Sequence, residues 1–167
     1  AVVLAAAPCG TFCAGMDLDE LRQTLGAQSD IIWDDAQRLS ALYDQIYRLP
    51  KPTIAAVNGA AVAGGCGLVT VCDLAIGTPT ALFGYPEVRR GLVAAMVMPH
   101  LLRLVGERAA RWLLLSGELI DGIRALRIGL LNSVAVEEQL LEEAGSWCEK
   151  LAEGGPQALA TTKELLR

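Results

Sequence analysis

Metal-binding chemistry has little support in this sequence, because the residues that it needs are scarce. The chain of 167 residues has a single histidine, His100, and its five cysteines form no C-x-x-C pair. One histidine cannot complete a zinc site with cysteines spaced in this way. An odd number of cysteines beside small apolar residues instead predicts free, buried thiols in a reducing compartment, and hence a cytoplasmic location.

Positive charge is also in short supply. The formal net charge is -5, and the 14 lysine and arginine residues are dispersed apart from the pair Arg89-Arg90. No basic stripe of the kind that binds nucleic acid is therefore present. The hydrophobic fraction of 53% and the charged fraction of 20% predict one globular domain with a large core, part of whose surface is covered by partner subunits.

A membrane-spanning helix is not expected either. The uncharged stretch Thr53–Cys72 is long enough in principle to cross a bilayer. It contains Asn58 and four glycines, however, which make it a poor lipid-facing helix. No signal peptide is evident, and the abrupt start inside the apolar run Ala1–Ala7 leads us to expect a fragment of a longer protein.

The apolar pattern predicts strands that alternate with helices, followed by a run of helices. Strands are expected at Val2–Ala6 (as a central strand), Thr53–Val57, Leu74–Ile76, Ala81–Gly84 and Leu131–Val136. Helices are expected from Asp17 or Asp19, over Asp30–Leu49, over Cys66–Val71, from near Pro99, and over Glu107–Leu115, Asp121–Ile128, Glu137–Glu153 and from Pro156. This order predicts an α/β layered domain followed by a helical region.

The glycine pair Gly64-Gly65 is the feature around which the rest is organised. It follows the strand Thr53–Val57 and the turn Asn58-Gly59, and it opens a short buried helix. A helix start offers free N–H groups, and glycine lets a ligand approach the backbone closely, so this point suits an oxygen that becomes anionic during a reaction. A phosphate-binding P-loop would need a lysine after its last glycine, and a dinucleotide fingerprint would need a different glycine spacing. Tight packing without chemistry remains the alternative.

Two further features join the glycine pair at predicted strand ends. They are the small-residue loop Ala14-Gly15-Met16-Asp17 and the single carboxylate Glu87, which follows Tyr85-Pro86. In an α/β domain such features converge at one rim of the sheet, which would bring a carboxylate close to two backbone segments.

The motifs FCAGMDL, KPTIAAVNGAAVAGGCGL, CDLAI and FGYPEVRRGL resemble the crotonase family, the enoyl-CoA hydratases and isomerases. The resemblance covers essentially the whole chain. It implies a ββα spiral core over residues 1–106, with its first strands missing, and a helical trimerisation region over residues 107–167. It also implies a homotrimer or hexamer that acts on an acyl-CoA thioester, with no cofactor beyond the coenzyme A of the substrate.

The same resemblance implies roles for individual residues. The backbone N–H groups of Met16 and Gly64 would hold the thioester oxygen, and Glu87 would act as acid and base. The neighbouring positions of these motifs would contact the substrate: Ala14, Gly15, Asp17, Gly65, Gly67 and Tyr85.

The chain departs from the hydratase pattern at two places. Hydratases carry a first glutamate on the helix after the glycines, and Gly67 stands there in this sequence. A glycine-rich turn after Glu87 is replaced by Leu92–Met98. A single carboxylate suffices for double-bond isomerisation, so hydratase and isomerase activity both stay open. A non-catalytic acyl-CoA-binding homologue is a further alternative, as is decarboxylase or hydrolase chemistry.

The remaining polar and aromatic residues have structural interpretations. Asp73 is expected to anchor a loop and Asp17 to cap a helix. His100 is expected to pack or to form a hydrogen bond, and Cys66 to be favoured for its small size. Tyr85 and Arg90 flank Glu87 and could orient it or contact the acyl group, whereas the three tryptophans are expected at packing or subunit contacts: Trp33, Trp112 and Trp147.

Overall fold

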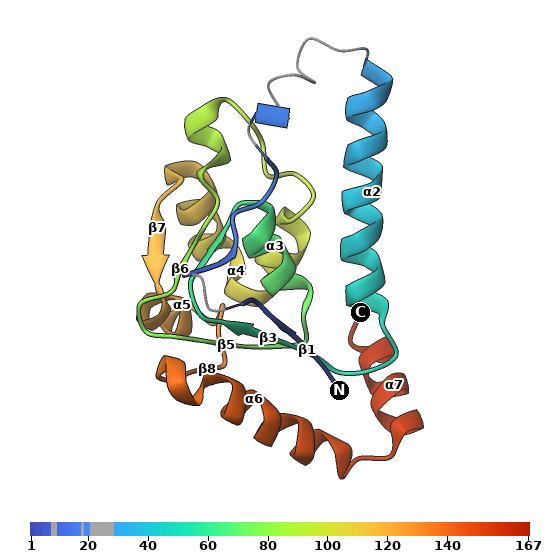
Figure 1. The fold of residues 1–167 in the computed structure, drawn as a ribbon. Coiled ribbons are helices and arrows are strands. Elements are labelled where there is room, and N and C mark those ends of the chain that lie inside the picture. The colour runs from blue at the N-terminus through green and yellow to red at the C-terminus, as the bar shows by residue number, and fades with distance from the viewer. Residues whose placement is uncertain (8–9, 18, 21–28) are drawn as a thin grey trace.

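The structure is a computed structural model, and it describes residues 1–7, 10–17, 19–20 and 29–167 (Figure 1). Eight strands in these residues form two sheets of four. The first sheet has the order β1-β3-β5-β8 and is parallel throughout, with β1 at Val2–Ala5, β3 at Thr53–Val57, β5 at Leu74–Gly77 and β8 at Ser133–Val134. The second has the order β2-β4-β6-β7, with β2 at Thr11–Cys13, β4 at Ala60–Val62, β6 at Leu82–Gly84 and β7 at Leu119–Asp121.

The chain winds through these sheets as a spiral. Each of the first three turns gives one strand to the first sheet, the next strand to the second sheet, and then a helical segment. In the last turn the order is reversed: β7 joins the second sheet, α5 follows, and β8 then joins the first sheet. The helices are α2 at Ser29–Arg48, α3 at Gly64–Val71, α4 at Met98–Ser116, α5 at Gly122–Arg127, α6 at Glu137–Ala152 and α7 at Pro156–Leu165, and a 3-10 turn, η1, spans Pro86–Arg90. The predicted α/β class and the ββα spiral are therefore confirmed.

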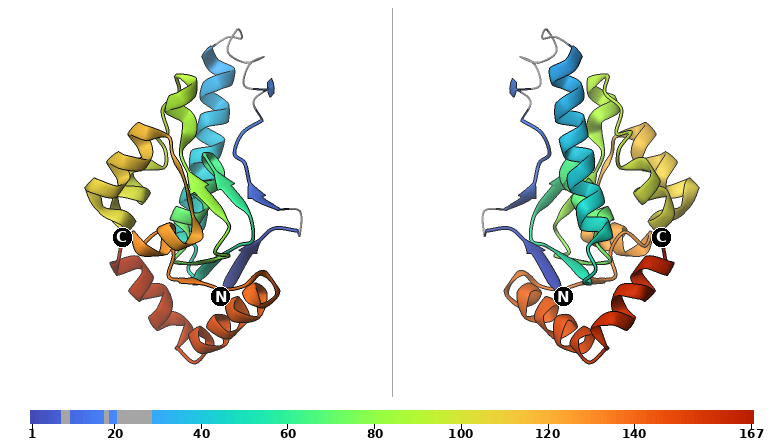
Figure 2. Two further views of the ribbon diagram at one scale, coloured as in Figure 1. Left: turned by 90° about the vertical axis from the view of Figure 1, so that its left-hand side faces the viewer. Right: turned by 90° about the vertical axis from the view of Figure 1, so that its right-hand side faces the viewer.

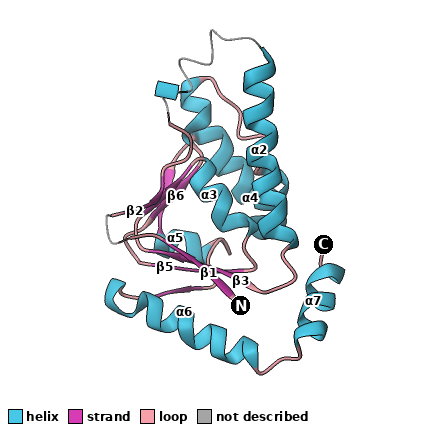
Figure 3. Cartoon of the chain, turned by 45° about the vertical axis from the view of Figure 1, so that its right-hand side comes forward, coloured by secondary structure: helices cyan, strands magenta, loops and turns pink. Residues whose placement is uncertain are grey.

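Helices cover the first sheet on both faces (Figure 3). The side chains of β3 alternate between two clusters: Ala55 and Val57 belong to the large core that includes α3 and α4, whereas Ile54 and Ala56 pack against α6. This alternation is the two-residue period of a strand buried on both faces. The two side views show α6 and α7 at one end of the molecule, below the sheets (Figure 2).

The element predictions were correct for the long periodic segments and wrong for three short strands. Strands β2, β4 and β7 were not predicted, because β2 and β4 are only three residues long and Leu119–Asp121 was assigned in part to a helix. β1 was expected to be a central strand, but among the described residues it pairs with β3 alone and lies at the edge of its sheet, with alternating exposure along its side chains. β8 is shorter than the predicted Leu131–Val136.

The helix α4 spans Met98–Ser116 and is kinked at Gly106. Gly106 has φ 72° and ψ 169° inside α4, so the two predicted helices meet there at a kink. The expected boundary between residues 106 and 107 falls at this kink, while β7 and β8 from the later segment join the two sheets. The division into two regions stays a prediction. Within the described residues, no helix has both the length and the apolar character needed to cross a membrane.

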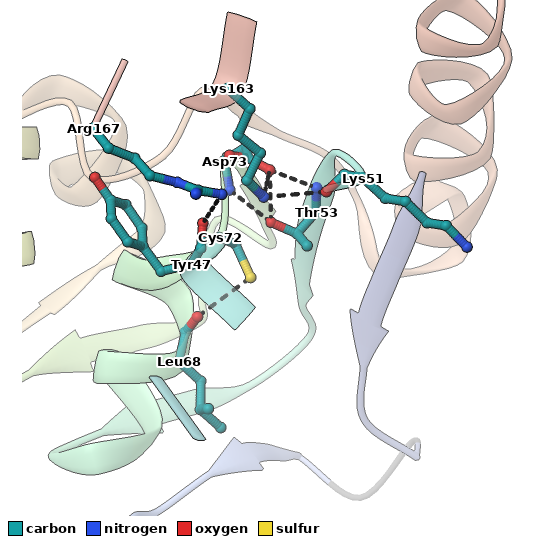
Figure 4. Close-up of polar contacts among 8 residues, drawn as sticks. All are labelled: Tyr47, Lys51, Thr53, Leu68, Cys72, Asp73, Lys163 and Arg167. Atoms are coloured by element: carbon teal, nitrogen blue, oxygen red, sulfur yellow. Dashed lines mark hydrogen bonds and ion pairs between the residues drawn. The ribbon is translucent and has the colours of Figure 1, made fainter. Parts of the chain in front are cut away.

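Asp73 ties the last helix, α7, to the first sheet (Figure 4). Its Oδ2 accepts hydrogen bonds from the Thr53 backbone N–H at 2.7 Å and from the Thr53 hydroxyl at 2.8 Å. The Lys163 ammonium donates to the same oxygen at 2.6 Å and to the Lys51 carbonyl at 3.1 Å. The Lys163 side chain is only 9% exposed. These contacts hold Asp73 against Thr53 and Lys163, as expected for a residue that anchors its loop.

Lys163→Met should lower the free energy of unfolding of the full-length protein by about 3 kcal/mol, because it leaves a partly buried carboxylate without its cation. Urea unfolding measures this change. Lys150→Met is the control, since Lys150 is exposed near the end of α6 and should change stability by less than about 0.5 kcal/mol. Equal stability of the two variants would contradict a role for the Lys163–Asp73 pair in holding α7.

Candidate functional site

A cleft of about 1210 Å³ lies where the end of β2, the start of α3 and the turn η1 meet. Its lining includes a polar group from each of these elements: Met16, Gly64 and Glu87. The lining also includes apolar residues from α2 and from the segment before α4: Leu39, Val93, Ala94, Met96 and Val97. An apolar cleft with a few convergent polar groups is the common form of a small-molecule site.

Glycine lets the end of β2 approach the start of α3 more closely than any other residue would allow. A Cβ placed on Gly65 would lie 1.9 Å from the Cys13 carbonyl oxygen. A Cβ placed on Gly15 would lie 3.1 Å from the backbone nitrogen of Gly64. The Gly15-Met16 loop and the Gly64 amide therefore border the same point, although 48 residues separate Met16 from Gly64.

The first turn of α3 has an unusual backbone. Ala63, its N-cap residue, has φ 54° and ψ -127°, and among the described residues it is the one non-glycine residue with positive φ. Such a conformation costs about 1–3 kcal/mol and persists only when the surroundings hold it. No hydrogen bond within the described residues uses the N–H of Gly64 or of Met16.

Glu87 has a carboxylate in an unusual state for a surface turn. It follows Pro86 in η1, and its Oε2 is buried without a hydrogen-bond partner among the described residues. Burial raises the pKa of Glu87 above its ordinary value of 4.5, and the nearby Arg90 guanidinium opposes that shift in part. A carboxyl group with a raised pKa is suited to accept a proton and to return it.

Tyr43 of α2 is the site residue that the sequence analysis missed. Its side chain is 2% exposed, and its hydroxyl donates a hydrogen bond to the Gly64 carbonyl at 2.8 Å. Its neighbour Leu42, which is also apolar, is 43% exposed. The spacing Leu39, Tyr43, Ile46 also fits a helical face, and that signal could have identified Tyr43.

The space above Gly67 is occupied. A Cβ on Gly67 would lie 2.5 Å from Val97 Cγ1, 2.8 Å from the Tyr43 hydroxyl and 3.0 Å from Tyr43 Cζ. A longer side chain at this position therefore requires Tyr43 and Val97 to move. In this chain, then, Gly67 provides no carboxylate, and the packing of Tyr43 and Val97 also requires that it have no side chain.

The structure brings most of the predicted site residues to one surface. Those that line the cleft are Ala14, Gly15, Met16, Asp17, Gly64 and Glu87. Gly65, Gly67 and Tyr85 do not line the cleft. Tyr85 is 1% exposed in the core, and its hydroxyl lacks a hydrogen-bond partner among the described residues. The Asp17 carboxylate accepts hydrogen bonds from the N–H groups of Asp19 and Glu20, at 2.8 and 3.3 Å. This is the expected capping contact; residues 18 and 21–28 of the expected helix lie outside the described residues.

The other singled-out side chains have structural contacts. The His100 ring lies edge-on to Tyr47, with centroids 4.8 Å apart, and burial lowers the pKa of this histidine. Trp112 donates to Glu118 at 2.9 Å, and Trp147 packs against the cluster below the first sheet, whereas Trp33 is 64% exposed. The four described cysteines are free, with Cys66 and Cys72 buried and Cys13 and Cys148 partly so; Cys9 lies outside the described residues. Arg90 lines the cleft beside Glu87.

Comparison with known proteins gives the same assignment over the whole chain. A family model described as enoyl-CoA hydratase/isomerase matches residues 1–167. A Thermus thermophilus protein named for enoyl-CoA hydratase is 45% identical over 157 residues, which are 93% of this chain and 61% of that protein. The crotonyl-CoA hydratase of Syntrophomonas wolfei is 37% identical over 158 residues, which are 92% of this chain and 58% of that protein.

Solved structures share the fold. A crystal structure of an enoyl-CoA hydratase from Shewanella pealeana matches 99% of this chain and 62% of its own, with a TM-score of 0.92 and 33% identity. An enoyl-CoA hydratase from Bacillus anthracis, solved at 1.8 Å, matches with a TM-score of 0.92 and 31% identity over 99% of this chain and 64% of its own. This chain spans less than two thirds of the length of each of these four proteins.

Glu87→Gln should make the protein more stable at neutral pH. A carboxyl whose pKa is raised by folding binds its proton more tightly in the folded state, so stability falls as pH rises from 4.5 through the folded pKa. Glutamine cannot ionise and avoids that loss. The melting temperatures of variant and wild type should agree at about pH 4, and the variant should melt higher at about pH 7.5.

The control for this experiment is Glu107→Gln. Glu107 is 69% exposed and pairs with Arg111 on the surface of α4, so its replacement should give no stability gain at neutral pH. A pH-independent difference between Glu87→Gln and wild type would contradict the raised pKa.

Proposed function

This chain belongs to the enoyl-CoA hydratase/isomerase family, and from that premise we propose that it is an acyl-CoA-processing enzyme whose reaction passes through a thioester enolate. The proposal rests on one observation above all. The Gly15-Met16 loop lies against the Gly64 amide on the wall of the same cleft that Glu87 lines, and the Glu87 Oε2 is buried without a hydrogen-bond partner among the described residues.

In the proposed site the N–H groups of Met16 and Gly64 donate to the thioester oxygen. Negative charge develops on that oxygen when a nucleophile adds to the β-carbon or a proton leaves the α-carbon. Donors that are already in place stabilise this charge without reorganisation, and the loss of one such donor typically lowers the rate about 10²–10³-fold. Because main-chain groups are the donors, the Met16 side chain is free to vary.

Glu87 would carry the proton in the hydration of a 2-enoyl-CoA, which is the activity that the relatives' names describe. The water oxygen forms a bond to the β-carbon as Glu87 takes a proton from the water. The electron pair of the double bond moves toward the thioester oxygen to give the enolate, and Glu87 then gives the proton to the α-carbon. A buried carboxyl with a raised pKa favours both halves of this transfer.

Isomerisation of a 3-enoyl-CoA is a second candidate, and the packed space above Gly67 favours it. Here Glu87 removes a proton from the α-carbon, the enolate forms, and the same group returns the proton at the γ-carbon. This reaction needs one carboxylate and no bound water. Val97 and Tyr43 fill the position from which a second carboxylate would extend, so the cleft supports a one-carboxylate reaction.

The substrate of the proposed enzyme is an acyl-CoA thioester, and the chemistry needs no cofactor beyond the coenzyme A that the substrate carries. A homotrimer or hexamer in the cytoplasm is part of the same proposal. Exposed apolar side chains on the later helices support association, among them Leu115, Leu141, Leu165 and Leu166, which are 70%, 62%, 82% and 75% exposed.

Glu87→Gln should lower turnover of the full-length protein by about 10²–10⁴-fold, because it removes the acid and base. Loss of the conjugated enoyl-thioester absorbance from a 2-enoyl-CoA measures hydration, and its appearance from a 3-enoyl-CoA measures isomerisation. Glu107→Gln should keep the wild-type rate. Unchanged turnover in Glu87→Gln would refute the acid–base assignment, and tight binding of both substrates by the wild type without turnover would support a non-catalytic acyl-CoA-binding protein.

Gly15→Ala should reduce turnover by about 10²-fold, because its methyl group would lie against the Gly64 N–H and obstruct the thioester oxygen. Gly106→Ala is the matched control. Gly106 has a similar positive φ of 72°, against 85° at Gly15, but a Cβ there would meet no atom within 4 Å. Thermal unfolding identifies a temperature at which both variants are folded, and at that temperature only Gly15→Ala should lose activity; equal activities would argue against the two-amide site.

A further inference from the structure

Tyr43 reaches from α2 into the first turn of α3. Its hydroxyl donates to the Gly64 carbonyl at 2.8 Å, and it lines the cleft beside that residue. A Cβ on Gly64 would lie 3.0 Å from the same hydroxyl. The phenol therefore lies directly against the residue whose amide is proposed to hold the substrate.

The turn that Tyr43 contacts needs support. Ala63 has a strained backbone, and no side chain caps the start of α3. From one side, the Ala63 N–H donates to the Gly84 carbonyl of β6 at 2.9 Å. From the other side, the Tyr43 hydroxyl holds the Gly64 carbonyl. These two contacts bracket the peptide unit between Ala63 and Gly64, which contains the Gly64 N–H.

We propose that Tyr43 is a positioning residue, which fixes the first turn of α3 so that the Gly64 N–H points at the thioester oxygen. This inference rests on the proposed function, because it assigns a task to Tyr43 within the same site. Tyr43 acts through Gly64 and does not exchange protons with the substrate.

The state of the phenol suits a fixed donor. Burial raises the pKa of Tyr43 to about 12, with smaller contributions from Cys13, Glu87 and Cys66. The hydroxyl keeps its proton at neutral pH and can donate to the Gly64 carbonyl without interruption. Because the phenol is neutral, it adds no second negative charge beside Glu87, which is the carboxylate that the proposed chemistry uses.

Gly67 gives a second, independent means of moving the phenol. A Cβ at Gly67 would lie 2.8 Å from the Tyr43 hydroxyl and 2.5 Å from Val97 Cγ1, so Gly67→Ala requires these side chains to move, and we expect this movement to weaken the Tyr43–Gly64 hydrogen bond. If Tyr43 acts by holding Gly64, then Tyr43→Phe and Gly67→Ala disrupt the same contact. Their effects on turnover should then not add, as in a double-mutant cycle for coupled residues.

The experiment compares Tyr43→Phe, Tyr47→Phe, Gly67→Ala and the double variant Tyr43→Phe/Gly67→Ala in the full-length protein. Tyr47 is the matched control, because it lies one turn further along α2 and contacts His100 outside the cleft. The readouts are kcat and KM on a 2-enoyl-CoA and a 3-enoyl-CoA, and the absorbance shift of a bound 2,4-dienoyl-CoA. Hydrogen bonds to the thioester oxygen draw electron density toward it and move that absorbance to longer wavelength.

Tyr43→Phe should lower kcat about three- to tenfold with KM nearly unchanged, the effect of one neutral hydrogen bond. It should also reduce the absorbance shift, whereas Tyr47→Phe should retain both wild-type values. The double variant should be no slower than the slower single variant.

If Tyr43→Phe keeps the wild-type kcat and absorbance shift, the inference is overturned. This holds even if the variant is less stable to heat. Fully additive losses in the double variant would overturn it as well. In each case a wild type that turns over its substrate leaves the proposed function standing. A wild type with neither turnover nor an absorbance shift would overturn the proposed function and the inference together. Tyr43→Phe preserves the ring, so the test does not depend on the folding of Gly67→Ala.

Discussion

The site depends on one steric constraint, the near contact between the end of β2 and the first turn of α3. Two chain segments can approach to this distance only where one of them has no side chain, and Gly65 meets that condition against the Cys13 carbonyl. The same approach sets the Gly15-Met16 loop beside the Gly64 amide. A methyl group at either glycine would separate the two segments or cover the amide, so the geometry of the cleft follows from the absence of Cβ atoms more than from any polar side chain.

The spiral makes this constraint useful, because it stacks equivalent points of successive turns. β2 and β4 are neighbours in the second sheet, and each is followed by the segment that forms part of the cleft wall. β6 is the next strand along, and it leads to Pro86 and Glu87 in η1. Three consecutive turns of the chain therefore deliver a loop amide, a helix-start amide and a carboxylate to one edge. The ion pair between Asp73 and Lys163 lies away from that edge and fastens α7 to the sheet instead.

The sequence predicted what depends on local pattern and motif, and missed what depends on distant packing. Helices such as α6 and α7 have clear apolar spacing and recognisable ends, and the glycine pair and Pro86-Glu87 are visible as motifs. β2 and β4 are three residues long, which is too short for an alternating pattern to appear in the sequence, so their strand character becomes visible only through their pairing in the sheet. β1 is apolar throughout, which suggested burial on both sides, yet no second strand pairs with it in the described residues. The task proposed for Tyr43 could not be derived from sequence, because its contact joins residues 43 and 64 through a carbonyl that every residue possesses.

Gly67 shows how one position can have both a chemical and a steric meaning. In the sequence it is a missing glutamate, which suggests only a loss. In the structure the missing side chain makes room for the Tyr43 ring and Val97, which fill the volume above it. A carboxylate added there would have to displace the Tyr43 phenol, which is hydrogen-bonded to the Gly64 carbonyl. That displacement would disturb the Gly64 amide, beside which the carboxylate would have to act. If Tyr43 holds Gly64 as proposed, the site favours a well-ordered amide and one half-buried carboxylate over a pair of carboxylates. The half-buried Glu87, with its raised pKa, fits such a site, because a lone acid that serves as both proton acceptor and donor gains from a pKa closer to neutral.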